Sequence, residues 1–217
     1  MTNATIMALH GLRDLSMFKW YAIPLLAIVS YIYAREIKEA RTTGNWNAVL
    51  AGLTVLGADF FNETWNSWVM YLTNRSAFWT TPGDTALRVM VGWNIEIIFM
   101  FSILGLIYYH TLSPTTKERI LGISEKWFWA IVFSAFCVFV EVLLNKGGHL
   151  IWEYPFWNRS FKGVWLIFLL GYLPFFALAI LVISLKNMKT KLLTVGVIYL
   201  VPALMNIVAL GFLKWKY

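Results

Sequence analysis

The 217-residue sequence is 59% hydrophobic and only 13% charged, and its mean hydropathy is +0.65. Because so few charged residues cannot cover a water-facing surface, the composition excludes an ordinary soluble domain. It predicts a protein embedded in lipid. The net charge of +7 is spread over many connections without a basic stripe, which excludes a nucleic-acid-binding protein and fits loops that touch anionic headgroups.

The N-terminal segment, residues 1–17, places leucine and isoleucine at roughly helical spacing against polar side chains. This pattern predicts a short amphipathic helix on the membrane surface. The apolar run 18–34 could imitate the core of a signal peptide, but Arg-Glu-Ile-Lys-Glu follows it in place of small residues. We interpret the run as the first span, so the chain divides into an interfacial segment, 1–17, and a single transmembrane helical domain, 18–217.

Further apolar segments follow, each near the ~20 residues that cross about 30 Å of hydrocarbon. They cover approximately 46–72, 87–111, 126–146, 162–186 and 190–213. Three prolines, Pro24, Pro174 and Pro202, fall inside spans, where membrane helices accommodate them by kinking. The sequence therefore predicts an all-α, multi-pass integral membrane protein, a bundle of about six transmembrane helices.

The connections between the predicted spans alternate in character. Those at 35–45, 112–125 and 186–191 are polar and basic, whereas those at 73–86 and 147–161 are rich in aromatic rings, which are typical of the membrane interface. Summed over whole sides, the basic residues are nearly balanced. The positive-inside rule therefore leaves the orientation open.

The second predicted span carries a polar stripe. At roughly 100° per residue, Asp59, Asn62, Glu63 and Asn66 fall within one narrow arc of a helix. Polar side chains inside the hydrocarbon layer mark functional sites by default, because they are expensive to place there. This stripe is the most informative feature of the sequence.

Other predicted spans add polar side chains at a similar depth. Glu96 lies near the start of the third span, Glu141 and Asn145 lie toward the end of the fourth, and Asn206 lies in the sixth. The aromatic connection 147–161 adds His149 on the same side. We expect these groups to converge in one pocket that opens toward the aromatic connections.

A charged side chain at the bilayer centre costs about 2.5 to 3.5 kcal/mol on insertion scales, so four bare carboxylates would cost on the order of 10 kcal/mol. The nearest basic residues, Arg88 and Lys146, lie at the ends of spans. The acids must therefore be protonated, share protons or hold a cation. The three solutions imply different functions.

Protonated acids in a dry aromatic pocket favour an enzyme that performs acid-base chemistry on a hydrophobic, isoprenoid-like or other lipid substrate, as an isomerase, cyclase or hydratase. We predict Glu63 and Glu96 as proton donor and acceptor, with Asp59 and Glu141 tuning them. Tryptophan faces would stabilise a carbocation. The predicted substrate-binding residues are Asn62, Asn66, Asn145, His149, Asn206, Trp65, Trp68, Trp93 and Trp152.

Two alternatives stay open. The same oxygen ligands suit a small cation or proton-coupled transporter, and polar side chains that only join helices suit a non-catalytic assembly protein. A Mg²⁺-dependent transferase acting on diphosphate lipids is disfavoured, because the sequence has no aspartate-rich motif. We predict no metal and no cofactor, since the single cysteine, Cys137, excludes a cysteine cluster. The expected partners are the bilayer and a hydrophobic small molecule, and a homo-oligomer is compatible with these features.

Overall fold

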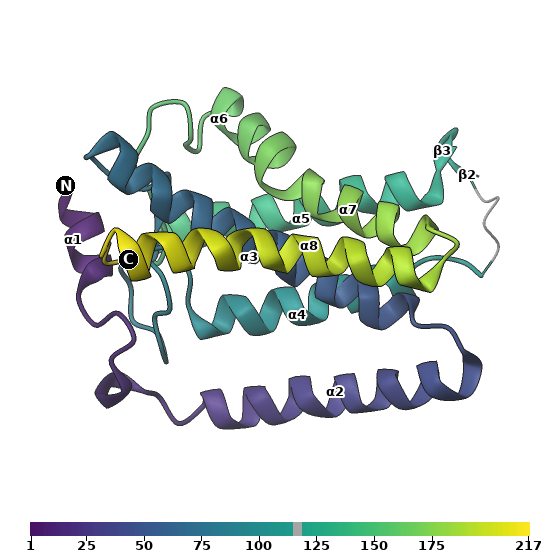
Figure 1. The fold of residues 1–217 in the computed structure, drawn as a ribbon. Helices are drawn as coiled ribbons and strands as arrows, with labels where there is room; N and C mark the ends of the chain where they lie inside the picture. The colour runs from purple at the N-terminus through teal and green to yellow at the C-terminus, as the bar shows by residue number, and fades with distance from the viewer. Residues whose placement is uncertain (115–118) are drawn as a thin grey trace.

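A computed structural model describes residues 1–114 and 119–217, and this part of the chain is helical through most of its length, as predicted (Figure 1). The helices are α1 (Asn3–Leu9), α2 (Ala22–Thr43), α3 (Asn47–Thr73), α4 (Ile95–His110), α5 (Glu125–Lys146), α6 (Phe161–Leu166), α7 (Leu173–Ser184) and α8 (Met188–Asn206). A 3-10 turn, η1 (Leu15–Met17), follows α1. The π-helical turn η2 (Ile167–Tyr172) joins α6 to α7, and a second, η3 (Ile207–Phe212), extends α8. The all-α fold class is confirmed.

Three helical segments among the described residues are long and apolar enough to cross a membrane: Glu125–Lys146, Phe161–Ser184 and Met188–Phe212. The helix Ile95–His110 is apolar but shorter. Helices α2 and α3, with 22 and 27 residues, are long enough to cross a membrane, but their residues are too polar on average for this set. The acidic stripe of α3 contributes to that composition.

Helix α3 is the centre of the bundle and packs against α4, α7 and α8, whereas α2 lies on the outer side along α4 (Figure 1). The crossing of α3 and α4 is close. A Cβ atom on Gly105 would lie 2.4 Å from the carbonyl oxygen of Ala51. Small residues at such crossings let two backbones approach, which strengthens van der Waals packing in lipid.

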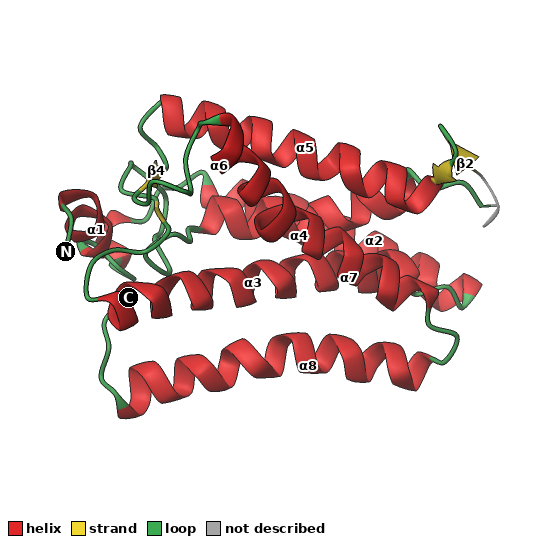
Figure 2. Ribbon diagram, turned by 90° about the horizontal axis from the view of Figure 1, so that it is seen from above, coloured by secondary structure: helices red, strands yellow, loops and turns green. Residues whose placement is uncertain are grey.

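The two aromatic connections meet at one end of the bundle. Strand β1 (Trp79–Thr80) pairs antiparallel with β4 (Ile151–Trp152), with Trp79 opposite Trp152. Figure 2 shows β4 beside α1 at this end, and both termini lie there too, because Arg13 donates to the carbonyl oxygen of Tyr217 at 2.8 Å. We call this the aromatic end of the bundle.

The opposite end carries the short connections. Strands β2 (Arg119–Ile120) and β3 (Ile123–Ser124) form a small hairpin within the predicted connection 112–125. Residues 115–118 of that connection lie outside the described part of the chain.

Two predicted boundaries are wrong. Helix α2 continues through the predicted connection 35–45 and ends only at Gly44, whose φ of 74° suits glycine. Helix α4 begins at Ile95 and not near 87, because the Asn94 side chain accepts from the N–H of Ile97 at 3.0 Å and caps the helix. The segment before α4 forms a loop. Within it, the side chain of Arg88 donates to the carbonyl of Gly83 at 2.6 Å.

The prolines have different consequences. Pro24 lies in the first turn of α2, where a helix needs no N–H donor. Pro174 follows the π-helical turn η2 and cannot donate to the carbonyl one turn earlier. Nearby, the carbonyl of Gly171 accepts from the side chain of Asn62 at 3.2 Å, which joins η2 to α3.

Candidate functional site

A cavity of about 110 Å³ lies between α3, α4, α5 and the η2–α7 region. Most of its wall is apolar, but Asp59, Asn62, Glu63 and Glu141 also line it. The stripe of α3 and the acid of α5 therefore meet inside the bundle, as their helical spacing predicted. An apolar cavity of roughly 150 Å³ accommodates benzene, so this volume suits one small ring or a branched chain end.

Each of the three acids accepts a hydrogen bond from the indole of a different tryptophan. The pairs are Trp93 Nε1 to Asp59 Oδ2 at 2.7 Å, Trp79 Nε1 to Glu63 Oε1 at 2.8 Å and Trp152 Nε1 to Glu141 Oε1 at 3.1 Å. All three tryptophans belong to connections and not to the helices that carry the acids. The connections therefore fix the orientation of the carboxyl groups.

The second oxygen of two of these acids makes no hydrogen bond of normal length and angle. Glu63 Oε2 and Glu141 Oε2 are buried without a hydrogen-bond partner among the described residues, and the two residues are only 3% and 6% exposed. Each carboxyl group has one polar donor beside it, the Asn66 amide at Glu63 and the Tyr172 hydroxyl at Glu141. Buried polar atoms are normally satisfied, so these free oxygens point to a ligand or a transferable proton.

The backbone at Gly92 approaches this cluster closely. A Cβ atom there would lie 2.6 Å from Glu63 Oε2 and 2.7 Å from Trp79 Cδ1. Only a glycine leaves room for the carboxyl group and its indole donor together. Gly92 thus shapes the cavity wall that it lines.

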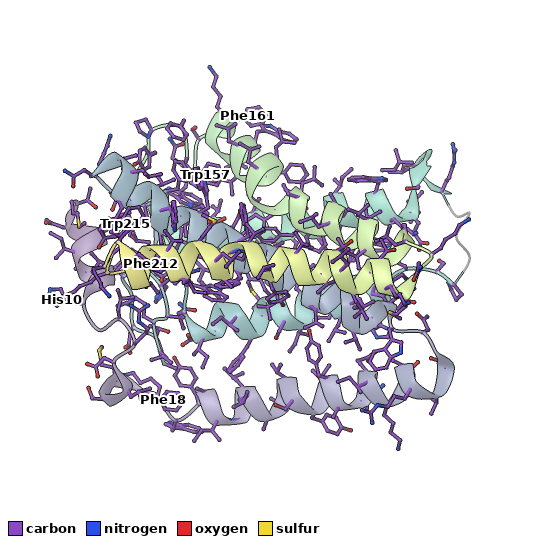
Figure 3. All side chains as sticks on the ribbon, viewed as in Figure 1. His10, Phe18, Trp157, Phe161, Phe212 and Trp215 are labelled. Atoms are coloured by element: carbon purple, nitrogen blue, oxygen red, sulfur yellow. The ribbon has the colours of Figure 1, made fainter. Side chains whose placement is uncertain are left out.

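Stacked rings close the cavity at the aromatic end of the bundle. The rings of Trp79 and Trp157 lie 5.9 Å apart with an interplanar angle of 23°, and both residues line the cavity. Figure 3 shows Trp157 toward the same end as Trp215 and His10. Asn66 holds this cap in place, because its side chain accepts from the N–H of Phe78 at 2.7 Å and donates to the Trp79 carbonyl at 2.8 Å.

Sequence reasoning missed several residues of the wall. The sequence patterns assign no site role to four residues that line the cavity: Trp79, Gly92, Cys137 and Tyr172. The glycine and the indole act through contacts between distant segments, which helical spacing cannot reveal. For Tyr172 a signal existed, since a polar ring in an apolar span was visible in the sequence.

The structure does not bring Glu96 to this cavity, so the expected meeting of Glu63 and Glu96 is wrong. Glu96 lies in the first turn of α4, outside the cavity wall. Its carboxyl accepts from the Tyr21 hydroxyl at 2.5 Å, the Thr85 hydroxyl at 2.6 Å and the Ala86 N–H at 2.8 Å. Glu96 ties the N-terminal segment and the loop before α4 together.

We expect Glu96→Ala to lower the stability of the protein by about 2 to 4 kcal/mol, because it removes bonds to a charged acceptor. The variant should keep the carboxyl pair of the cavity intact. Thermal unfolding in detergent checks this. A variant with unchanged unfolding temperature would contradict the tethering role of Glu96.

The other predicted substrate-binding residues divide by location. Trp93 and Trp152 serve the acids as donors, whereas the side chain of Asn145 donates to the Leu150 carbonyl at 2.9 Å. Asn206 bonds Thr64 at 2.7 Å and accepts from the Tyr217 hydroxyl at 3.0 Å. Eight residues of the predicted binding set are not part of the cavity wall: Trp65, Asn66, Trp68, Trp93, Asn145, His149, Trp152 and Asn206. Of the predicted binding set, the wall itself holds Asn62.

No group of three histidine, cysteine or acidic side chains within the described ranges, 1–114 and 119–217, has the geometry to hold a metal ion. Asp59, Glu63 and Glu141 nevertheless interact electrostatically with one another.

Comparisons with known proteins place this architecture among membrane proteins. The model of an uncharacterized membrane protein family matches residues 2–211. An uncharacterized protein of Archaeoglobus fulgidus is 44% identical over 214 residues, which cover 99% of each chain. No solved structure matches the chain.

Proposed function

The chain belongs to this uncharacterized membrane protein family, and from that premise we propose that it is an integral membrane enzyme that performs acid-base chemistry on a hydrophobic substrate. The reaction is a proton-initiated isomerisation or cyclisation of an unsaturated, isoprenoid-like lipid. Glu63 and Glu141 form the proton-transferring pair, and Asp59 tunes them.

The proposal includes six membrane crossings. They are α2, α3, α4, α5, the continuous segment α6–η2–α7, and α8 with η3. Helix α1 and the turn η1 lie against the surface of the membrane at the aromatic end. The depth of the acids follows: at 1.5 Å per residue, Glu63 lies about 15 Å from the end of α3 at Thr73.

One observation carries the proposal: two carboxyl groups from separate helices face one apolar cavity, each anchored through one oxygen and free at the other. An indole N–H donates but has no proton that it readily gives up, so it orients a carboxyl group without neutralising it. Like charges in a dry site cannot both persist cheaply, which supports a single proton shared by the pair. One carboxylic acid and one carboxylate are what proton donation and removal require.

The proposed reaction balances without an external reactant. The protonated carboxyl group gives its proton to one carbon of a C=C bond, whose π electrons form the new C–H bond and leave a carbocation on the other carbon. Either a neighbouring C=C attacks this carbon to close a ring, or no ring forms. The second carboxylate then removes a proton from an adjacent carbon, whose C–H electrons form a C=C bond, and the proton returns to the first acid.

The walls support such an intermediate. Four aromatic residues line the cavity: Trp79, Trp157, Phe101 and Phe175. Aromatic faces attract positive charge by about 0.5 to 2 kcal/mol each without offering a nucleophile. The apolar surroundings also keep bulk water from capturing the cation.

The proposal is tested by comparing the lipids of two membrane preparations, both of which contain unsaturated isoprenoid chains. One carries the native protein and the other carries the double variant Glu63→Gln/Glu141→Gln. Chromatography with mass spectrometry should reveal a product of unchanged mass and altered retention with the native protein only. In D₂O-equilibrated membranes this product should carry deuterium. A product one water heavier would identify a hydratase. Identical lipid profiles, or an ion flux in vesicles that the double variant abolishes, would overturn the enzyme proposal.

A further inference from the structure

The exposed part of the cavity wall lies on one side of the bundle. Three lining residues are exposed and apolar: Met100 of α4 at 42%, and Phe136 and Leu144 of α5 at 58% and 37%. The lining residues from α3, η2 and α7 are buried or half-buried. The cavity therefore reaches the surface between α4 and α5. These two helices pack against each other far less than α3 packs against α4.

The opening lies midway along α5, a helix long and apolar enough to cross a membrane. Phe136 is midway along the 22-residue helix α5, about 15 Å from either end at 1.5 Å per residue. The lining residues toward the aromatic end are Trp79, Trp157 and Leu150, and those toward the other end, Leu104 and Phe175, are buried. No described polar residue continues the cavity wall toward the Leu104 side.

We propose that the substrate is a hydrocarbon-chain lipid dissolved in the bilayer, which enters sideways between α4 and α5 with one unsaturated chain end leading. This inference rests on the proposed function, because it assigns the substrate class and its route to the same acids. Three features carry it: an apolar mouth facing lipid, closed ends above and below, and the free oxygens of Glu63 and Glu141 inside.

The size of the cavity selects the part of the substrate that reacts. A volume of about 110 Å³ admits a chain end of one small ring or one branched unit, and not a whole lipid. The remainder of the chain must stay in the lipid beyond Met100 and Phe136. The reaction therefore takes place at a terminus of the chain, and the enzyme tolerates variation in chain length.

Photolabelling in liposomes tests the route without requiring turnover. The probe is a long alkyl chain with a diazirine at its terminal carbon, and peptide mass spectrometry locates the adducts after irradiation. We expect adducts on the α5 peptide around Cys137 and Glu141. Phe136→Trp, which enlarges a mouth residue, should reduce these adducts several-fold. Phe139→Trp is the matched control, because Phe139 is also 58% exposed on α5 but does not line the cavity.

Two results would overturn the sideways route. One is equal labelling of the cavity in both tryptophan variants, and the other is cavity labelling by a charged, water-soluble diazirine. Either result leaves the acid-base proposal intact if the native protein still forms the product and the variant Glu63→Gln/Glu141→Gln does not. Conversely, cavity labelling that depends on Phe136, with an unchanged lipid profile, would support lipid binding and reject the chemistry.

Discussion

Glu63→Gln should reduce the rate of lipid conversion by about 10²- to 10⁴-fold, the usual contribution of a positioned general acid or base. The amide keeps the shape of the side chain, and its oxygen can still accept from Trp79 Nε1, which bonds Glu63 at 2.8 Å in the native protein. It cannot give or take the proton. Because the free Oε2 is replaced by an amide NH₂ without an acceptor, a stability loss of about 1 to 3 kcal/mol is also expected.

Glu141→Gln should reduce the rate by a similar factor, and the double variant should be little worse than either single one, because the two groups act as a unit. Initial product formation per folded protein is the quantity to measure. Glu36→Gln is the matched control: Glu36 is 8% exposed, bonds His110 Nε2 at 3.0 Å and lies outside the cavity wall. Full activity in both Glu63→Gln and Glu141→Gln would contradict the role of this carboxyl pair in proton transfer.

Gly92→Ala should disrupt the site by overpacking. Its new methyl group would lie 2.6 Å from Glu63 Oε2 and 2.7 Å from both Asn66 Nδ2 and Trp79 Cδ1, so the carboxyl group, the cap and the loop cannot all keep their places. Overpacking of this kind costs about 1 to 3 kcal/mol. We expect a lower unfolding temperature and loss of most of the activity, because the Trp79–Glu63 bond is displaced.

Gly196→Ala provides the comparison for this substitution. Gly196 lies in α8, and a Cβ atom there meets nothing within 4 Å. An alanine in a helix interior is favoured over glycine by up to about 1 kcal/mol, so this variant should be as stable as the native protein or more stable. Thermal unfolding and lipid conversion, measured in parallel, separate the two positions. Equal behaviour of both variants would contradict the close approach at Gly92.

Spacing along single helices predicted much of the fold and part of the site. The stripe of Asp59 and Glu63 follows from the helical repeat, and the depth of Glu141 follows from its place in an apolar run. The helical repeat orders the side chains of one helix at a time. It holds for these acids because α3 and α5 are regular over the residues concerned.

The same reasoning failed for Glu96, because it assumed a helix that starts near 87. Asn94 caps α4 instead, and the loop before the cap supplies the partners that hold Glu96. Which acids meet depends on the rotation of each helix about its axis, and that is fixed by packing between helices. The indole donors were likewise beyond prediction. Trp79 and Trp152 reach the acids only because two aromatic connections, about 70 residues apart in sequence, pair as β1 and β4.

That pairing has a consequence for how the protein matures during synthesis. The donor to Glu63 follows α3 directly, but the strand that pairs with it, and the donor to Glu141, come only after α5 has been made. A nascent chain that stops before residue 151 carries both acids on α3 and α5, but its cap over the cavity is incomplete. The acids of the cavity thus gain their full set of indole donors late, after most of the helices have been made.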